Sequence, residues 1–98
     1  ATITKFEDIE SRQKARELKQ TVYRVTQRGE FSRDFVLRDP IRRAAISATA
    51  NIAEGFERSG NRELVHFSAI EGSVGEVQDH LYTALEQSYI TQQEFDEM

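Results

Sequence analysis

The clearest pattern in the sequence lies at residues 67–84, FSAIEGSVGEVQDHLYTA. Its apolar residues recur in steps of three and four, at Phe67, Ile70, Val74, Val77, Leu81 and Ala84. This spacing puts them on one face of an α-helix. Flanking apolar residues widen that face, which favours a globular bundle over an isolated coiled coil. Gly72 and Gly75 lie inside the helix, where each lowers helix stability by about 1 kcal/mol relative to Ala. We therefore expect a close helix contact there that compensates for this loss.

Two more helices are predicted before this one, which itself spans about residues 62–88. The first covers about residues 6–28 and ends at Gly29, which suits a left-handed stop. Residues 30–38 lack periodicity, and we expect the apolar side chains of this connector to cover the end of the bundle. Asp39 can cap free amides and Pro40 is preset for a first helical position, so the second helix is predicted over about residues 40–58.

The last residues predict the start of a fourth helix. Thr91 and Glu94 have the spacing of a capping box, and Ile90 and Phe95 occupy the positions of a hydrophobic staple. A helix over residues 92–98 has less than two turns, too few to be stable alone or to cover the third helix. We therefore expect the intact protein to continue beyond this clipped fourth helix. The prediction is an all-α fold, one helical-bundle domain over residues 1–98.

Composition excludes several classes of function. A chain of 98 residues has room for one small core, and the absence of Cys removes disulfides and thiolate chemistry. No run approaches the roughly 18 apolar residues of a membrane span, and no leader is apparent, so we expect a cytoplasmic protein with no membrane contact.

The histidines do not predict a metal site. Glu63 and His66 have the Glu-x-x-His spacing of di-iron bundles, but Val77 stands three residues before the other histidine, His80. The two imidazoles lie 14 residues apart, about 21 Å along a helix. There is no nucleophile elbow and no Gly-rich phosphate loop. We therefore expect no metal, no cofactor and no enzymatic activity.

Charge is distributed unevenly along the chain. Residues 1–43 hold 11 Lys/Arg and 7 Asp/Glu, whereas residues 44–98 hold 2 and 10. These halves of net charge +4 and −8 can be solvated faces, or can attract each other within one molecule. They can also meet head to tail in a self-associated ring. A basic face for nucleic acid is a third possibility, against which the pI of about 5.2 argues.

Four polar positions near the second helix are candidate contact residues. Arg38, Arg42 and Arg43 form the only local cluster that could meet phosphate, although Arg42 and Arg43 can instead pair with Asp39 or with acids of the third helix. Asn51 lies beside the apolar stripe. It either fixes helix register through a buried hydrogen bond or marks a contact surface.

Several motifs resemble those of the 23S rRNA intervening-sequence protein family, also called the four-helix bundle protein family. The runs RRAAIS at 42–47 and NIAEGF at 51–56 resemble its signature. KAREL at 14–18, followed by Tyr23, looks like its first helix, and EGS at 71–73 with Glu76 looks like its third. The resemblance covers essentially the whole chain. Pro40 departs from the polar residue usual there, and a tryptophan frequent near Ser11 is absent.

The resemblance implies an up-down bundle of four antiparallel helices that assembles into a ring, commonly a pentamer, and is not an enzyme. Family members are encoded in insertions within bacterial large-subunit rRNA genes or elsewhere in bacterial genomes. A related, strongly basic branch assists the reverse transcriptase of diversity-generating retroelements, whereas this chain is acidic. We carry over only a packing or association role, to Arg43, Asn51 and Glu54, beside the small residue Gly55. An RNA- or DNA-binding accessory protein, such as a reverse-transcriptase partner, is the alternative.

Overall fold

The computed structural model describes residues 5–57 and 61–98, and within them the side chains of residues 10–53 and 69–98. The elements are α1 (Lys5–Thr26), the short 3₁₀ helix η1 (Phe31–Arg33), α2 (Phe35–Glu57), α3 (Asn61–Glu86) and α4 (Gln92–Glu97). No strand occurs in these two ranges. None of the helices described is both long and apolar enough to cross a membrane.

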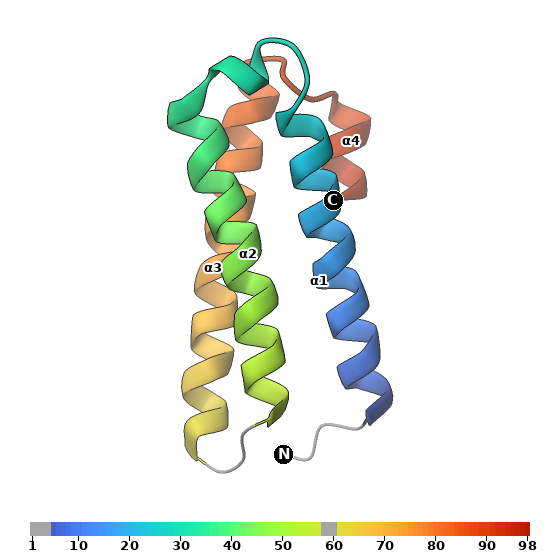
Figure 1. Cartoon of the computed structure of the whole chain (residues 1–98), viewed down its shortest axis with the longest axis vertical. Helices are drawn as coiled ribbons and strands as arrows, with labels where there is room; N and C mark the ends of the chain where they lie inside the picture. Colours follow the sequence, from blue (N-terminus) through green and yellow to red (C-terminus); the bar gives the residue numbers. More distant parts are fainter. Residues whose placement is uncertain (1–4, 58–60) are drawn as a thin grey trace.

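The three long helices run alongside one another, and α2 contacts both α1 and α3 (Figure 1). α1 and α3 run in the same direction and α2 runs in the opposite one. The body is elongated, 44 × 22 × 17 Å. α4 turns back beside α1 at the end of the body where α1 and α3 finish. The all-α fold is therefore confirmed, and α1 to α3 alternate in direction.

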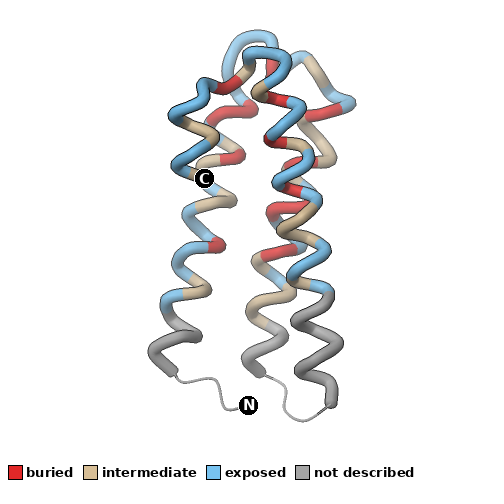
Figure 2. Tube along the Cα trace, turned by 180° about the vertical axis from the view of Figure 1, so that it is seen from behind, coloured by how far each residue is buried: buried red, intermediate tan, exposed pale blue. Residues whose placement is uncertain are grey.

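The core is formed by the apolar faces that the periodicity predicts. Each of the three long helices buries apolar side chains to less than a tenth of their surface, among them Val22, Val25, Ile41, Ala45, Val77, Leu81 and Ala84. Figure 2 shows these buried positions gathered toward the end of the body that carries η1 and α4. Phe31, Leu37 and Ile90 close the core there. Phe67 lies outside the described side chains.

The end of α1 agrees with the prediction. Gly29 has φ +40°, a left-handed conformation that favours glycine. The chain then turns so that Phe31, which is 1% exposed, stacks against Tyr89 with ring centroids 4.8 Å apart. The Thr26 hydroxyl, fully buried, donates to the carbonyl of Val22 at 2.7 Å. The connector is thus held against the core by an aromatic pair.

The predicted start of the second helix at Pro40 is wrong, because α2 begins at Phe35. Asp34 provides the start: its Oδ1 accepts the amide of Leu37 at 3.2 Å, and its carbonyl accepts that of Arg38 at 2.8 Å. Pro40 therefore stands in the second turn, where its missing N–H leaves the carbonyl of Val36 without its helical bond. Val36 is 87% exposed, so this end of the helix tolerates the loss.

Only part of the connector covers the core. Phe31 and Leu37 are buried, but Phe35 and Val36 are 59% and 87% exposed. The expectation that all the apolar residues of this segment cover the bundle end is therefore wrong for these two. The early start of α2 explains the difference, because it places both side chains in its first turn on the outer side of the helix.

The fourth helix begins as predicted. The Thr91 hydroxyl accepts the amide of Glu94 at 3.1 Å, and the Glu94 carboxylate accepts the amide of Thr91 at 2.9 Å, which completes the capping box. Ile90 is 3% exposed, and Phe95 packs against the core. The ring of Phe95 also lies 4.7 Å from that of Tyr82 on α3. α4 is thus anchored on α3.

The expected close contact at the glycines of α3 is absent from the described structure. A methyl group added at Gly72 or Gly75 would meet no heavy atom within 4 Å outside its own helix. Helical spacing explains why, because both glycines lie on the side of α3 away from the apolar face. Neither glycine is therefore required by packing within the described part of this chain.

Candidate interaction surfaces

Asn51 joins α2 to α3. Its side-chain amide donates to the hydroxyl of Ser73 at 3.1 Å and to the carbonyl of Ala69 at 3.4 Å. Both bonds cross a shallow groove lined by small residues of the two helices. Asn51 therefore holds the two helices in a fixed register. Glu54 and Gly55, the other association candidates of this helix, lie outside the described side chains.

The three candidate arginines make different contacts. Arg38 pairs with Asp39 at 2.9 Å, donates to the carbonyl of Ser32 at 2.9 Å, and stacks over the ring of Phe35 at 4.4 Å. Arg42 reaches across to α1. Its Nε donates to the hydroxyl of Thr26 at 2.8 Å, and its guanidinium lies 4.7 Å from the ring of Tyr23.

Arg43 lies on the other side of α2. It is exposed and lines a groove with Glu76 and His80 of α3, but makes no ion pair with a described residue. The structure therefore does not join Arg38, Arg42 and Arg43 into one phosphate-sized cluster. Arg38 is engaged near the start of α2, Arg42 belongs to the seam with α1, and Arg43 faces the seam with α3.

Comparison with known proteins identifies the family. The model of the 23S rRNA-intervening sequence protein family matches residues 7–98. The chain belongs to this family. Comparisons with curated proteins and with solved structures found no match. The family description refers to an rRNA intervening sequence and names no reaction.

A basic surface of this family member escaped the sequence analysis. Arg12, Arg16 and Lys19 follow one another in steps of four and three, so they share one face of α1. That face lies along the seam with α2, because Arg12 donates to the carbonyl of Ala53 at 3.5 Å and Tyr23, four residues after Lys19, stacks with Arg42. We call Arg12, Arg16, Lys19 and Arg42 the basic strip. Their spacing was the signal that could have revealed it.

Most of this positive charge is not neutralised locally. Arg16 and Lys19 make no ion pair with any described residue, and the nearby Lys14 differs because it pairs with Glu10 at 3.1 Å. Arg42 is occupied by a hydroxyl and an aromatic ring, neither of which carries charge. Arg16, Lys19 and Arg42 of the basic strip therefore meet no described carboxylate along the outer side of the α1–α2 seam.

α3 has the opposite character. No Lys or Arg occurs anywhere in residues 63–98. Glu76, Asp79 and Glu86 are exposed and lie within one side of α3 by helical spacing. Gly72 and Gly75 precede them on the outward part of the same helix. We call Glu76, Asp79 and Glu86 the acidic strip.

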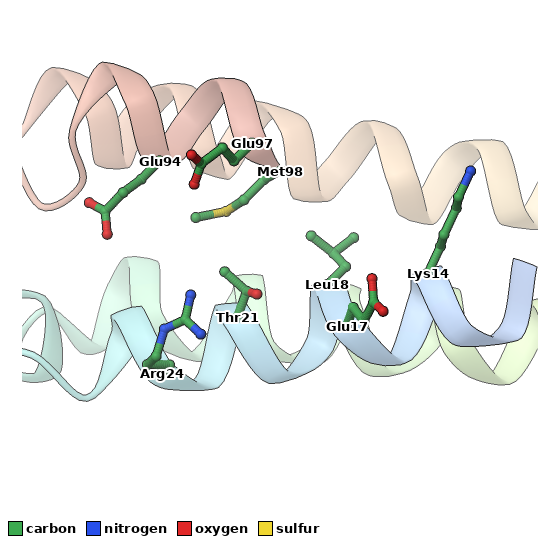
Figure 3. A pocket seen from close by; sticks show the side chains of 8 residues that line it. All are labelled: Lys14, Glu17, Leu18, Thr21, Arg24, Glu94, Glu97 and Met98. Carbon is green, nitrogen blue, oxygen red and sulfur yellow. The ribbon is translucent and has the colours of Figure 1, made fainter. Parts of the chain in front are cut away.

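An open groove lies beside α4. Figure 3 shows its polar part, in which side chains of α1 (Lys14, Glu17, Leu18, Thr21 and Arg24) face Glu94, Glu97 and Met98 of α4. A neighbouring apolar part is lined by residues that include Leu18, Val74 and Leu81. Among the described residues no three His, Asp or Glu side chains are grouped to hold a metal ion.

Arg28, in the turn after α1, makes an ion pair with Glu94 of α4. Its guanidinium donates to both carboxylate oxygens of Glu94, at 2.8 and 3.1 Å, and to the carbonyl of Tyr89 at 3.3 Å. The bonds from Arg28 and from the amide of Thr91, with the positive charge of Arg28, lower the pKa of Glu94 from 4.5 to about 2. Tyr89 in turn donates its hydroxyl to Asp34 at 2.9 Å, and that bond raises the pKa of the phenol. This cluster fixes α4 to the connector and does not resemble a catalytic centre.

Proposed function

We propose that this chain is a non-enzymatic, cytoplasmic bundle protein that self-associates into a ring-like homo-oligomer. A pentamer is the size favoured by its family. The observation that supports self-association is the scarcity of ion pairs between the two charged halves among the described side chains. Of the ion pairs between described side chains, only Arg28–Glu94 joins residues 1–43 to residues 44–98. The remaining charge of each half is available to a neighbouring copy.

The proposal includes the arrangement of the whole bundle. Exposed apolar surface between α1 and α3 adjoins Phe95 of α4 and the following residue Met98. An antiparallel helix that runs on in the direction of α4 would cover this surface and complete an up-down bundle of four helices. Support comes from the capping box and from the contact of Phe95 with Tyr82, which already direct α4 along this groove.

Light scattering coupled to size-exclusion chromatography tests self-association. We expect a discrete oligomer at low ionic strength that weakens as salt screens the charged faces. A monomer at every concentration and salt level would contradict the proposal. The bundle expected for this family has four complete helices. The same measurement should therefore also be made on the longest form of the protein that can be expressed.

Nucleic-acid binding, for instance as an accessory protein of a reverse transcriptase, is the second candidate. The basic strip supports it, because positive charge there is interleaved with an aromatic side chain, Tyr23. Titration with rRNA fragments distinguishes the two functions, since phosphate contacts weaken steeply with salt. Replacing Arg16 and Lys19 of the basic strip with Ala should then reduce binding to all sequences alike.

A further inference from the structure

We infer that the basic strip of one copy docks against the acidic strip of the next, with α1 of the first copy running parallel to α3 of the second. This inference rests on the proposed self-association and names the two surfaces that carry it. Both surfaces belong to every copy and they differ from each other, so the contact is head to tail.

The basic strip is held in place for such a contact. Arg12 is tied to α2 by its bond to Ala53, and Arg42 is tied to α1 by Thr26 and Tyr23. Arg16 lies between these ties, exposed, with no ion pair to a described residue. A partner that supplies carboxylates to Arg16 would therefore not have to displace any carboxylate of the described residues.

The acidic strip has the shape that a close helix contact needs. Glu76 and Asp79 are exposed, and the space over Gly72 and Gly75 is open. Two glycines in a helix reduce its stability, and nothing in the described part of the chain packs against them. A neighbouring α1 that lies over them would bring its backbone close to α3 and its cations close to Glu76 and Asp79.

The two strips lie at matching heights along the molecule. Arg12 bonds to Ala53 of α2, and Ser73 bonds to Asn51, two residues away on the same helix. Two residues correspond to about 3 Å along the axis, so Arg12 and Ser73 are nearly level. Because α1 and α3 run in the same direction, Arg16 falls near the height of Glu76 to within about one turn of 5.4 Å (Figure 1).

The same count brings Lys19 to the height of Asp79. In a ring whose axis follows the long axis of the molecule, all copies point the same way and stand at the same height. α1 of one copy and α3 of the next are then parallel, as the inference requires. Under those conditions Arg16 faces Glu76 and Lys19 faces Asp79, without sliding one copy along the other.

Charge reversal on each strip tests the inference. The first variant is R16E/K19E and the second is E76K/D79K, each compared with the parent by sedimentation velocity, with circular dichroism to check helix content. We expect each variant alone to self-associate at least about tenfold more weakly than the parent, because like charges then face each other. Combining all four substitutions in one chain, R16E/K19E/E76K/D79K, should restore the parental oligomer, since every reversed strip then meets a reversed partner.

Q27E/R33E/Q87E is the matched control for R16E/K19E, because it makes the same change in net charge at exposed residues outside both strips and outside the groove beside α4. It should leave the oligomer intact. If the parent is monomeric, the proposed function itself fails. If the parent is oligomeric and R16E/K19E assembles normally, only the inference fails. Loss of rRNA-fragment binding by R16E/K19E with an unchanged oligomer would also overturn it, and would assign the basic strip to nucleic acid.

Discussion

Replacing both glycines of α3, as G72A/G75A, should stabilise the monomer. Glycine within a helix is less favourable than alanine by about 0.5–1 kcal/mol. Neither new methyl group would meet a heavy atom within 4 Å, so no clash opposes the gain. The double variant should therefore raise the free energy of unfolding by about 1–2 kcal/mol. For a domain of this size we expect an increase in Tm of roughly 4–16 °C.

Thermal unfolding followed by circular dichroism at 222 nm measures this effect, at a protein concentration and salt level where sedimentation shows a monomer. Unchanged or reduced stability of the monomer would refute the reasoning, because it would mean that the glycines pack against something within the chain. The same variant should weaken self-association, since its methyl groups occupy the surface that we assign to a neighbouring α1. A gain in monomer stability together with a weaker oligomer is an outcome that a purely structural role of the glycines does not give.

Three other changes test the described structure. The lowered pKa of Glu94 means that its ion pair with Arg28 stabilises the fold fully above about pH 4.5, and that this stability is lost as pH falls toward 2. E94Q should flatten that part of the pH–stability curve measured by urea unfolding. I41A should reduce the free energy of unfolding by about 2–5 kcal/mol, measured in the same way, because Ile41 is fully buried. N51A removes two hydrogen bonds to α3 and should reduce the free energy of unfolding by about 1 kcal/mol. An unchanged urea midpoint would show that Asn51 does not stabilise the packing of the two helices.

The sequence allowed correct prediction where one local rule acts alone. The periodicity of α3 identified Val77, Leu81 and Ala84 as core residues, and the capping box located α4. The start of α2 was missed because two capping signals compete. Asp39–Pro40 has the stronger local preference, but Asp34 begins the helix one and a half turns earlier, which also buries Leu37. Burial across the bundle determines which signal is used.

The interaction surfaces were harder to predict because they combine residues of different helices. Arg38, Arg42 and Arg43 are close in sequence, yet Arg38 contacts the connector, Arg42 contacts α1 and Arg43 faces α3. The basic strip joins Arg16 of α1 to Arg42 of α2 through a seam whose register the sequence does not give. Gly72 and Gly75 were correctly located within a helix, but the open space beside them becomes visible only once the chain is folded.

Asp34 stabilises two separate parts of the chain at the end of the molecule that carries η1 and α4. One carboxylate both begins α2, by accepting the amide of Leu37, and receives the hydroxyl of Tyr89, which lies 55 residues further along the chain. The start of α2 and the docking of the segment around Tyr89 are therefore thermodynamically coupled. If either the Leu37 amide or the Tyr89 hydroxyl is lost, the Asp34 carboxylate can move away from the other. A change that loosens the C-terminal segment should therefore also increase fraying at the start of α2, where Phe35 and Val36 are exposed.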